Sequence, residues 1–505
     1  MEALVQQATE SVCGTSKAVQ DLQRATGVKG NLSKEILHEV KEKTKEAPLG
    51  ERRAFAYRAF LERKQSLLDV TLLCSDFDPA KHTPVELLHT FLLGVVKYLW
   101  YETQSNLSSS DKERFASKLS DLSHLSIAGQ KTSQATYIRK HPNSLIGRHL
   151  KEIIQLGVFA LEDLQVNVDV FRLWLDLGRL TTLVWFTAIS DTERFRQNLK
   201  VAVANVLDGF SMIYPSKMLR KAKLHLLVHL EEDILRFGPL PGLTTERFES
   251  YNAVFRHSAV YSNRQHPSRD IAVDCAGHEL VKQAVSGGFM RDGEVWRLPS
   301  KSLIDLAEGI PVLRDHFTLE RRLERPGDYA ISTGKQRREP SLGNDTRLVN
   351  ESDCPFQKWE DAQACNYVVS KEMDRCYRDS WVVARIPGDT VIGRVLELLC
   401  FNEQAYVVLH MFGLCGKMDS TLEMPLLKSE SRSIIAKADS ILFDFNVQES
   451  KGRFLLNYHS LHHQDLIYRV IPGEFFDVTY RFDDRERLHY RVAEKIREDK
   501  IEKAA

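Results

Sequence analysis

The stretch KAKLHLLVHLEEDILRFGPLPGLTTERFESYNAVFRHSAVYSNRQHPSRD, residues 221–270, combines two helix-spaced histidines, a Gly-Pro break and two glutamates three positions apart. Apolar residues recur with a helical period until Gly238, which is followed by proline and therefore predicts the end of a helix. One of the two following threonines can cap a second helix, whose first turn contains Glu246. The stretch thus predicts two consecutive helices, with Glu246 and Glu249 on one face of the second.

Composition is typical of a soluble globular protein. The 505 residues are 43% hydrophobic and 27% charged, and 69 Lys and Arg balance 69 Asp and Glu. Any binding to nucleic acid would therefore depend on a local patch rather than on net charge. Eight scattered cysteines indicate free thiols in a reducing compartment.

Neither a membrane span nor a secretory signal is expected. The most apolar stretch, residues 85–100, is broken by His89 and Lys97 and is shorter than the roughly 20 residues that a spanning helix needs. The first residues contain an early glutamate and no apolar core. We therefore expect a nuclear or cytoplasmic protein without a membrane partner.

Hydrophobic periodicity predicts a mainly α, multidomain chain, α+β overall: a large all-α body followed by a small C-terminal β-barrel-like module. The module is expected because short β-branched and aromatic runs are separated by turn residues. The predicted segments are, in order, an N-terminal helical segment (1–66), the all-α body (67–290), a linker and irregular segment (291–374), the β-rich module (375–448) and a tail with a helix (449–505).

Within the body, a long helix is expected from Pro84 to about Thr103. The other helical patterns cover residues 115–125, 145–159, 168–186 and 195–212. Glycines at positions 157, 178 and 209 are expected to interrupt three of these helices.

Two sets of side chains could hold metal. His225 and His229 are four positions apart on one helix, but the metalloprotease pattern needs a glutamate after the first histidine, where this chain has Leu226. We interpret both histidines as packing residues and predict no metal and no cofactor. The glutamates Glu246 and Glu249 could supply carboxylates to divalent cations, although glutamate at a helix start commonly stabilises the helix dipole.

A locally basic segment follows Glu246. Arg256, Arg264 and Arg269, interleaved with aromatic residues, could contact DNA phosphates. The alternative is a polar helix end followed by a turn. Histidines at positions 459, 462 and 463 form only a weak cluster by spacing.

A family resemblance rests on six stretches. They are KLHLLVHLEEDILRFGPL (223–240), TERFESYNAVFRHSAVYSNRQHPSRDIA (245–272), FDPAKHTPVELLHTFLLGVVKYLW (77–100), NSLIGRHLKEIIQ (143–155), VIGRVLELL (391–399) and DSILFDFNVQ (439–448). Together they resemble a group of fungal proteins associated with transposons. The central part is similar to the C-terminal half of CACTA-type (En/Spm-like) DDE transposases. The resemblance covers residues 67 to 448.

The resemblance implies an RNase-H-like core that holds two Mg²⁺ ions with three acids, and an all-helical insertion before the last acid. Glu86-Leu87-Leu88-His89 resembles the family's D-x-x-H phrase with Glu in place of Asp, and Glu246 matches the final Glu. The first acid should lie on an upstream strand, but only helical patterns precede Glu86. We therefore expect Glu86 and Glu246 to be vestigial, and the chain to be a degenerate or domesticated transposase without strand-transfer activity that acts, if at all, by binding DNA.

Two alternatives remain open. The chain could be an active Mg²⁺-dependent transposase or nuclease in which Asp76 or Asp78 replaces the missing acid. It could instead be a purely structural helical scaffold.

Overall fold

The computed structural model of the chain forms two compact units, Met1–Pro84 and Val85–Ala505. The described helices of the first unit include α2 (Ser16–Thr26), α3 (Asn31–Thr44) and α5 (Pro79–His82). The boundary expected near residue 66 lies outside the described residues. The structure describes residues 6–7, 9–10, 16–26, 31–45, 47–48, 50–58, 79–128, 132–310, 312–313, 324–332, 361–470, 477–482 and 485–502.

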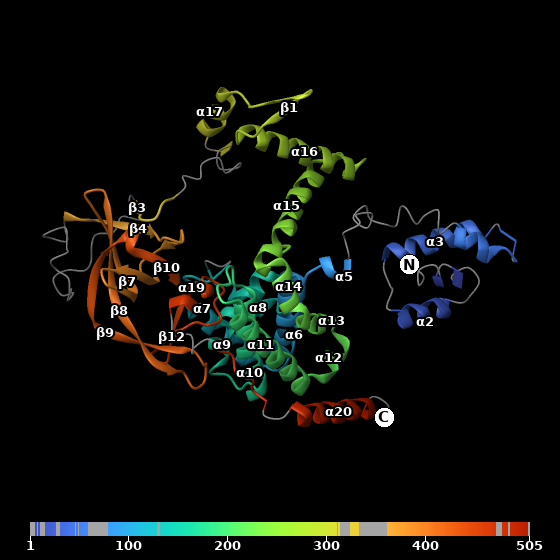
Figure 1. The fold of residues 1–505 in the computed structure, drawn as a ribbon, viewed down its shortest axis with the longest axis horizontal. Helices are drawn as coiled ribbons and strands as arrows, with labels where there is room; N and C mark the ends of the chain where they lie inside the picture. Colours follow the sequence, from blue (N-terminus) through green and yellow to red (C-terminus); the bar gives the residue numbers. More distant parts are fainter. Residues whose placement is uncertain are drawn as a thin grey trace. The chain divides into compact units, whose positions relative to one another are not determined.

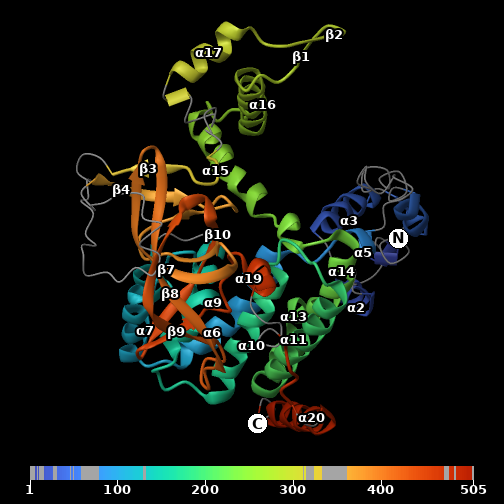
Figure 2. The same ribbon diagram turned by 60° about the vertical axis from the view of Figure 1, so that its left-hand side comes forward.

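The second unit begins with a helical body, as predicted (Figures 1 and 2). Side chains of Ser108, Asn167 and Asp191 cap three of its helices. Between residues 85 and 289 every described element is helical. The elements are η2 (Leu87–Val96), α6 (Lys97–Asn106), α7 (Ser109–Asp121), α8 (Ala135–Lys140), α9 (Gly147–Leu161), α10 (Val168–Val184), α11 (Thr192–Ile213), α12 (Pro215–Arg220), α13 (Ala222–Leu226), η3 (Leu227–His229), α14 (Leu230–Phe237), η4 (Leu240–Leu243), α15 (Glu246–Tyr261) and α16 (Pro267–Val285).

The expected long helix near Pro84 starts later and in a different form. Its N-cap is Glu86, and residues Leu87–Val96 form a π-helix before α6 continues to Asn106. π-Helices are rare and are found disproportionately at functional sites. The start of η2, with its N-cap Glu86, is therefore a candidate functional position.

The prediction that glycines interrupt three helices is wrong, because α9, α10 and α11 run continuously through Gly157, Gly178 and Gly209. Two of these glycines are explained by close packing against a neighbouring side chain rather than by a break in the helix. A Cβ atom at Gly178 would lie 2.4 Å from the ring of His459, and one at Gly209 would lie 3.0 Å from Leu173. At these two positions the neighbouring side chain occupies the space that a larger residue would need.

A curled antiparallel sheet follows the helical body (Figure 1). The strand order is β10-β6-β7-β8-β9-β12-β11, and β4 pairs with β3, β5 and β7. This confirms the predicted α+β class. The strands are β3 (Tyr329–Ile331), β4 (Gln363–Val369), β5 (Arg375–Cys376), β6 (Trp381–Ile386), β7 (Asp389–Phe401), β8 (Gln404–Met418), β9 (Pro425–Lys437), β10 (Ile441–Phe445), β11 (Val447–Ser450) and β12 (Arg453–Leu456).

The sheet shares its core with the helical body. One continuous cluster of buried apolar side chains contains Trp174 and Phe210 of the helices together with Trp381, Phe412 and Phe445 of the sheet. Polar contacts join the same surfaces, including a hydrogen bond from Thr182 Oγ1 to the carbonyl oxygen of residue 458 (2.7 Å). The β-rich region therefore belongs to the compact unit that begins at Val85, whereas the sequence suggested a separate module.

The segment expected to be a linker contains regular structure in its described parts. A hairpin of β1 (Met290–Asp292) and β2 (Val295–Arg297) is followed by α17 (Lys301–Gly309), and β3 and β4 belong to the sheet. After the sheet come α19 (Gln464–Val470) and α20 (Arg485–Glu502). None of the described helices combines the length and the apolar character that crossing a membrane requires.

Candidate functional site

Glu86 joins the start of η2 to the start of α15. Its Oε1 accepts hydrogen bonds from the main-chain N–H groups of Leu88 (2.8 Å) and Thr245 (2.9 Å), and its Oε2 accepts one from that of His89 (2.6 Å). Burial raises the pKa of Glu86, but these main-chain donors outweigh burial and leave the pKa below its ordinary value. Glu86 is therefore an ionised carboxylate whose two oxygens already have partners.

The structure brings the two acids singled out by the resemblance into one region. His89 lies between Glu86 and a third acid, Glu249: its Nδ1 lies 3.0 Å from Glu86 Oε2, and its Nε2 lies 2.8 Å from Glu249 Oε1. Beside this bridge, Glu246 Oε2 pairs with Lys151 Nζ at 2.7 Å. We call Glu86, His89, Lys151, Glu246 and Glu249 the Glu–His–Lys cluster.

The contacts within the Glu–His–Lys cluster are typical of a structural ion-pair network. Lys151 pairs with one oxygen of Glu246, main-chain donors bind both oxygens of Glu86, and the imidazole of His89 lies between Glu86 and Glu249. Two-metal chemistry needs several carboxylates that face one point. The alternative first acids, Asp76 and Asp78, lie outside the described residues.

His225 and His229 lie close together but on the surface. Their ring centroids are 5.3 Å apart, and both residues are exposed. Because both side chains are exposed, the interpretation of His225 and His229 as packing residues is wrong. Within the described part of the chain, neither belongs to a group of three or more side chains that could share a metal ion.

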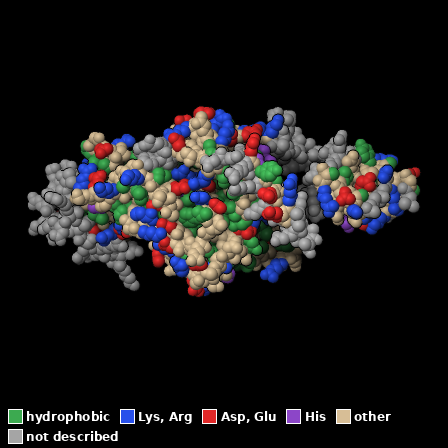
Figure 3. All heavy atoms as spheres, turned by 90° about the horizontal axis from the view of Figure 1, so that it is seen from below, with side chains coloured by type: hydrophobic (Ala, Val, Ile, Leu, Met, Phe, Trp, Pro, Cys, Tyr) green, Lys and Arg blue, Asp and Glu red, His purple; other side chains and the backbone are tan. Residues whose placement is uncertain are grey.

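Arg256, Arg264 and Arg269 are exposed on α15, in the following loop and on α16. None of the three forms an ion pair with another described residue. Elsewhere basic and acidic side chains are interspersed, as on the face in Figure 3. Positive charge is thus locally unbalanced between residues 256 and 269, where the sequence contains no Asp or Glu.

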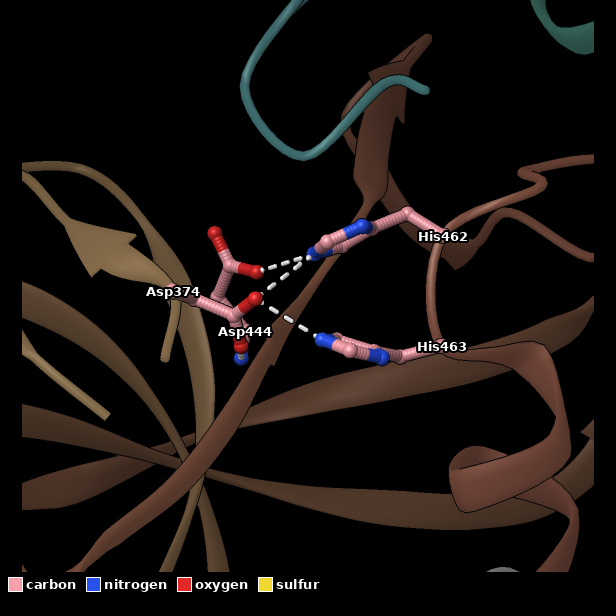
Figure 4. A group of neighbouring side chains, drawn as sticks. All are labelled: Asp374, Asp444, His462 and His463. Carbon is pink, nitrogen blue, oxygen red and sulfur yellow. Dashed lines mark hydrogen bonds and ion pairs between the residues drawn. The ribbon is translucent and has the colours of Figure 1, made fainter. Parts of the chain in front are cut away.

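A second cluster, which the sequence indicated only weakly, is more compact. Asp374 precedes β5, Asp444 belongs to β10, and His462 and His463 precede α19 (Figure 4). His462 Nε2 lies 2.6 Å from Asp444 Oδ1 and 3.3 Å from Asp374 Oδ1, and His463 Nε2 lies 2.8 Å from Asp374 Oδ1. We call these four residues the Asp–His cluster.

Burial and hydrogen bonding set the charges of the Asp–His cluster. Burial lowers the pKa of His462, but hydrogen bonds to Asp374 and Asp444 raise it to about 9. Burial likewise raises the pKa of Asp374, and its bonds to His462 and His463 outweigh that effect and lower the pKa well below its usual range. Asp374 is therefore ionised at neutral pH, and Oδ1 of each aspartate has an imidazole of the cluster as its partner.

Sequence reasoning missed the Asp–His cluster because its members are far apart along the chain. Asp374 and Asp444 are 70 residues apart, and Asp374 and His463 are 89 apart. Only the adjacent pair His462-His463 gave a local signal, and that spacing is not specific to metal sites. The acids would have been found only from the pairing of the strands.

Comparisons with known proteins cover only part of the chain. Residues 329–450 match the family described as Domain of unknown function (DUF8590). No curated protein and no solved structure is similar enough to match. The matched segment contains Asp374 and Asp444 and ends before β12, His462 and His463, so the chain is similar to this family over most of the sheet and half of the Asp–His cluster.

Proposed function

We propose that this chain is a transposase-derived protein that lacks complete catalytic machinery and binds DNA through the basic segment, residues 256–269. The resemblance to CACTA-type transposases supplies the starting point. The observation that carries the proposal is the state of the two matching acids. Glu86 and Glu246 lie in one cluster, as a descendant of an active site would have them, yet both are occupied by protein donors.

The protein contacts that Glu86 and Glu246 already make argue against strand transfer. A two-metal site places several carboxylates around ions that are about 4 Å apart. Here the ammonium group of Lys151 lies 2.7 Å from Glu246 and neutralises it. A metal ion would have to displace Lys151 and three main-chain hydrogen bonds to Glu86.

Exposed, unpaired arginines support DNA binding. An arginine that contacts phosphate releases condensed counterions, so each contact changes the salt dependence of binding by about 0.9 in log–log slope. Three arginines separated by no acidic residue provide up to three such contacts.

The binding half of the proposal is tested by changing charge in two places. The test variant replaces Arg256, Arg264 and Arg269 by alanine, and its affinity for duplex DNA is measured by fluorescence anisotropy over a range of salt. We expect weaker binding and a log–log slope smaller by about 3. The matched control replaces three other partly exposed arginines, each of which is paired with an acid: Arg114, Arg139 and Arg172. Equal loss in both variants would show that the basic segment has no special role.

The catalytic half is tested with the purified chain, Mg²⁺ and a plasmid or transposon-end substrate. We expect neither nicking nor joining. Glu246→Gln should leave DNA affinity unchanged or slightly increased, because it removes one negative charge. Mg²⁺-dependent nicking that disappears in Glu246→Gln would replace this proposal with the active nuclease alternative.

A further inference from the structure

We propose that Asp374, Asp444, His462 and His463 bind a single first-row transition-metal ion of the Zn²⁺ type, which fastens the loop before α19 to the sheet. This inference is independent of the transposase proposal, because none of the four residues belongs to the Glu–His–Lys cluster.

The distances suit one ion. Ligand atoms from all four residues lie within 4.8 Å of one another. With metal–ligand bonds of about 2.1 Å, a tetrahedron has edges of about 3.4 Å. The His462 and His463 contacts with the carboxylates, 2.6 to 3.3 Å, need only a small expansion to reach that value. Both imidazoles present Nε2 to the shared point, as Figure 4 shows.

The remaining carboxylate oxygens are held in place by other groups. Asp444 Oδ2 accepts a hydrogen bond from Ser126 Oγ (2.6 Å). Asp374 Oδ2 accepts bonds from Ser370 Oγ (3.0 Å) and from the main-chain N–H of Asp444 (3.1 Å). Groups that hydrogen-bond to a metal ligand in this way fix its orientation and raise the affinity for the metal ion. Each aspartate therefore offers one oxygen, Oδ1, to the centre of the cluster.

The ligand types select the ion. Two imidazoles and two carboxylates suit Zn²⁺ and its first-row neighbours, whereas Mg²⁺ and Ca²⁺ prefer oxygen ligands. Four protein ligands complete a tetrahedron, which is the arrangement of structural rather than catalytic zinc sites.

The position of the site indicates what the ion would hold together. Asp374 lies in the turn before β5, Asp444 in β10 at the end of the main strand order, and the histidines in the segment that leads to α19. Ser126 connects Asp444 to the helical body as well. An ion at this point would therefore cross-link three segments of the chain beside the shared core.

The experiment uses the full chain, stripped of metal with a chelator and then titrated with Zn²⁺. We expect one tightly bound Zn²⁺ per chain by elemental analysis, no displacement by excess Mg²⁺, and an increase in the thermal unfolding midpoint on Zn²⁺ addition. Co²⁺ in place of Zn²⁺ should give the visible absorption of a tetrahedral site. A folded wild-type chain that retains no Zn²⁺ would show that the cluster is only an ion-pair network and would overturn the proposal.

Variants locate the bound ion. Ser126→Ala removes a hydrogen bond to the ligand Asp444 and should reduce Zn²⁺ affinity by roughly 10- to 100-fold, and His462→Gln, which removes a ligand, should reduce it further. The matched control is His229→Gln, which changes an exposed histidine of the other histidine pair and should leave Zn²⁺ affinity unchanged. If His462→Gln does not fold, Ser126→Ala and the Zn²⁺-dependent unfolding midpoint of the wild type decide the question. Undiminished binding by both cluster variants, or loss in His229→Gln, would place the ion elsewhere.

Discussion

Gly178 allows α10 to pack against His459, and replacing it with alanine should destabilise the protein. A Cβ atom at this position would lie 2.4 Å from both Nδ1 and Cε1 of the His459 ring. The ring cannot easily move away, because His459 is 2% exposed and its main-chain N–H donates to Asn457 Oδ1 at 3.0 Å. The two residues are 281 positions apart, so the contact is entirely tertiary.

Two opposing effects set the size of the change. Forcing a methyl group into a filled core costs about 1–3 kcal/mol, and the depth of this overlap favours the upper end. Replacing a helical glycine with alanine returns about 1 kcal/mol. We therefore expect Gly178→Ala to lower the free energy of unfolding by about 2 kcal/mol.

Gly157→Ala is the matched control, because this glycine is also buried inside a helix of the body but its nearest neighbour, Ile153 Cγ2, would be 3.4 Å away. It should be neutral or more stable by up to about 1 kcal/mol. Both variants are compared by urea unfolding at pH 7, followed by circular dichroism. In a His459→Ala background the Gly178→Ala change should become neutral or favourable, which gives a coupling energy of about 3 kcal/mol. Equal stabilities for the two glycine variants, or additive effects in the double variant, would refute the argument.

Two further predictions concern buried charge. Burial and the nearby Arg179 lower the pKa of His459 to about 3 from an unfolded value of 6.5, so the unfolded chain binds the extra proton between these pH values. The free energy of unfolding should therefore be unaffected by His459 above pH 6.5 and should fall by about 1.4 kcal/mol per pH unit below it. Urea unfolding at pH 7 and at pH 5.5 should show this loss of stability in the wild type and a smaller loss in His459→Gln. Equal losses in the two proteins would contradict the prediction. Arg481 pairs with buried Asp176 and with Glu423 (2.8 Å), so Arg481→Ala should cost about 3–5 kcal/mol by leaving a buried carboxylate unpaired. Arg172→Ala, which breaks an exposed pair, should cost under about 1 kcal/mol in the same unfolding assay, and similar costs for both would rule out the buried pair as the cause.

Local patterns predicted the helices well and their glycines poorly. The periods over 145–159, 168–186 and 195–212 correspond to α9, α10 and α11 within a few residues. Helical period and side-chain caps are properties of neighbouring residues, and so they are visible in sequence. The reason for glycine at position 178 is not visible in the sequence, because its neighbour His459 belongs to a segment that follows the sheet.

The sheet shows the same limit. Strands β6, β7, β8 and β10 are largely buried and are β-branched or aromatic, like the runs that predicted the β-rich module. β9 is not such a run, because its centre, Lys428 to Arg432, is polar and mostly exposed. The strand exists because β8 and β12 pair with it on either side, and pairing partners cannot be read from a local pattern.

The two clusters differ in a way that sequence motifs do not reveal. Glu86 and His89 were singled out by their resemblance to the D-x-x-H phrase, but they lie at a helix start, whose main-chain N–H groups donate to both oxygens of Glu86. Asp374 and Asp444 have no local motif, yet each has one oxygen fixed by outer donors and one directed at the histidines. The groups bound to Glu86 are main-chain N–H groups, which cannot bind a metal ion, whereas those bound to Asp374 Oδ1 and Asp444 Oδ1 are imidazoles, which become metal ligands when they lose a proton. By this criterion the Asp–His cluster, and not the motif that resembles a catalytic phrase, is the part of the chain prepared to hold an ion.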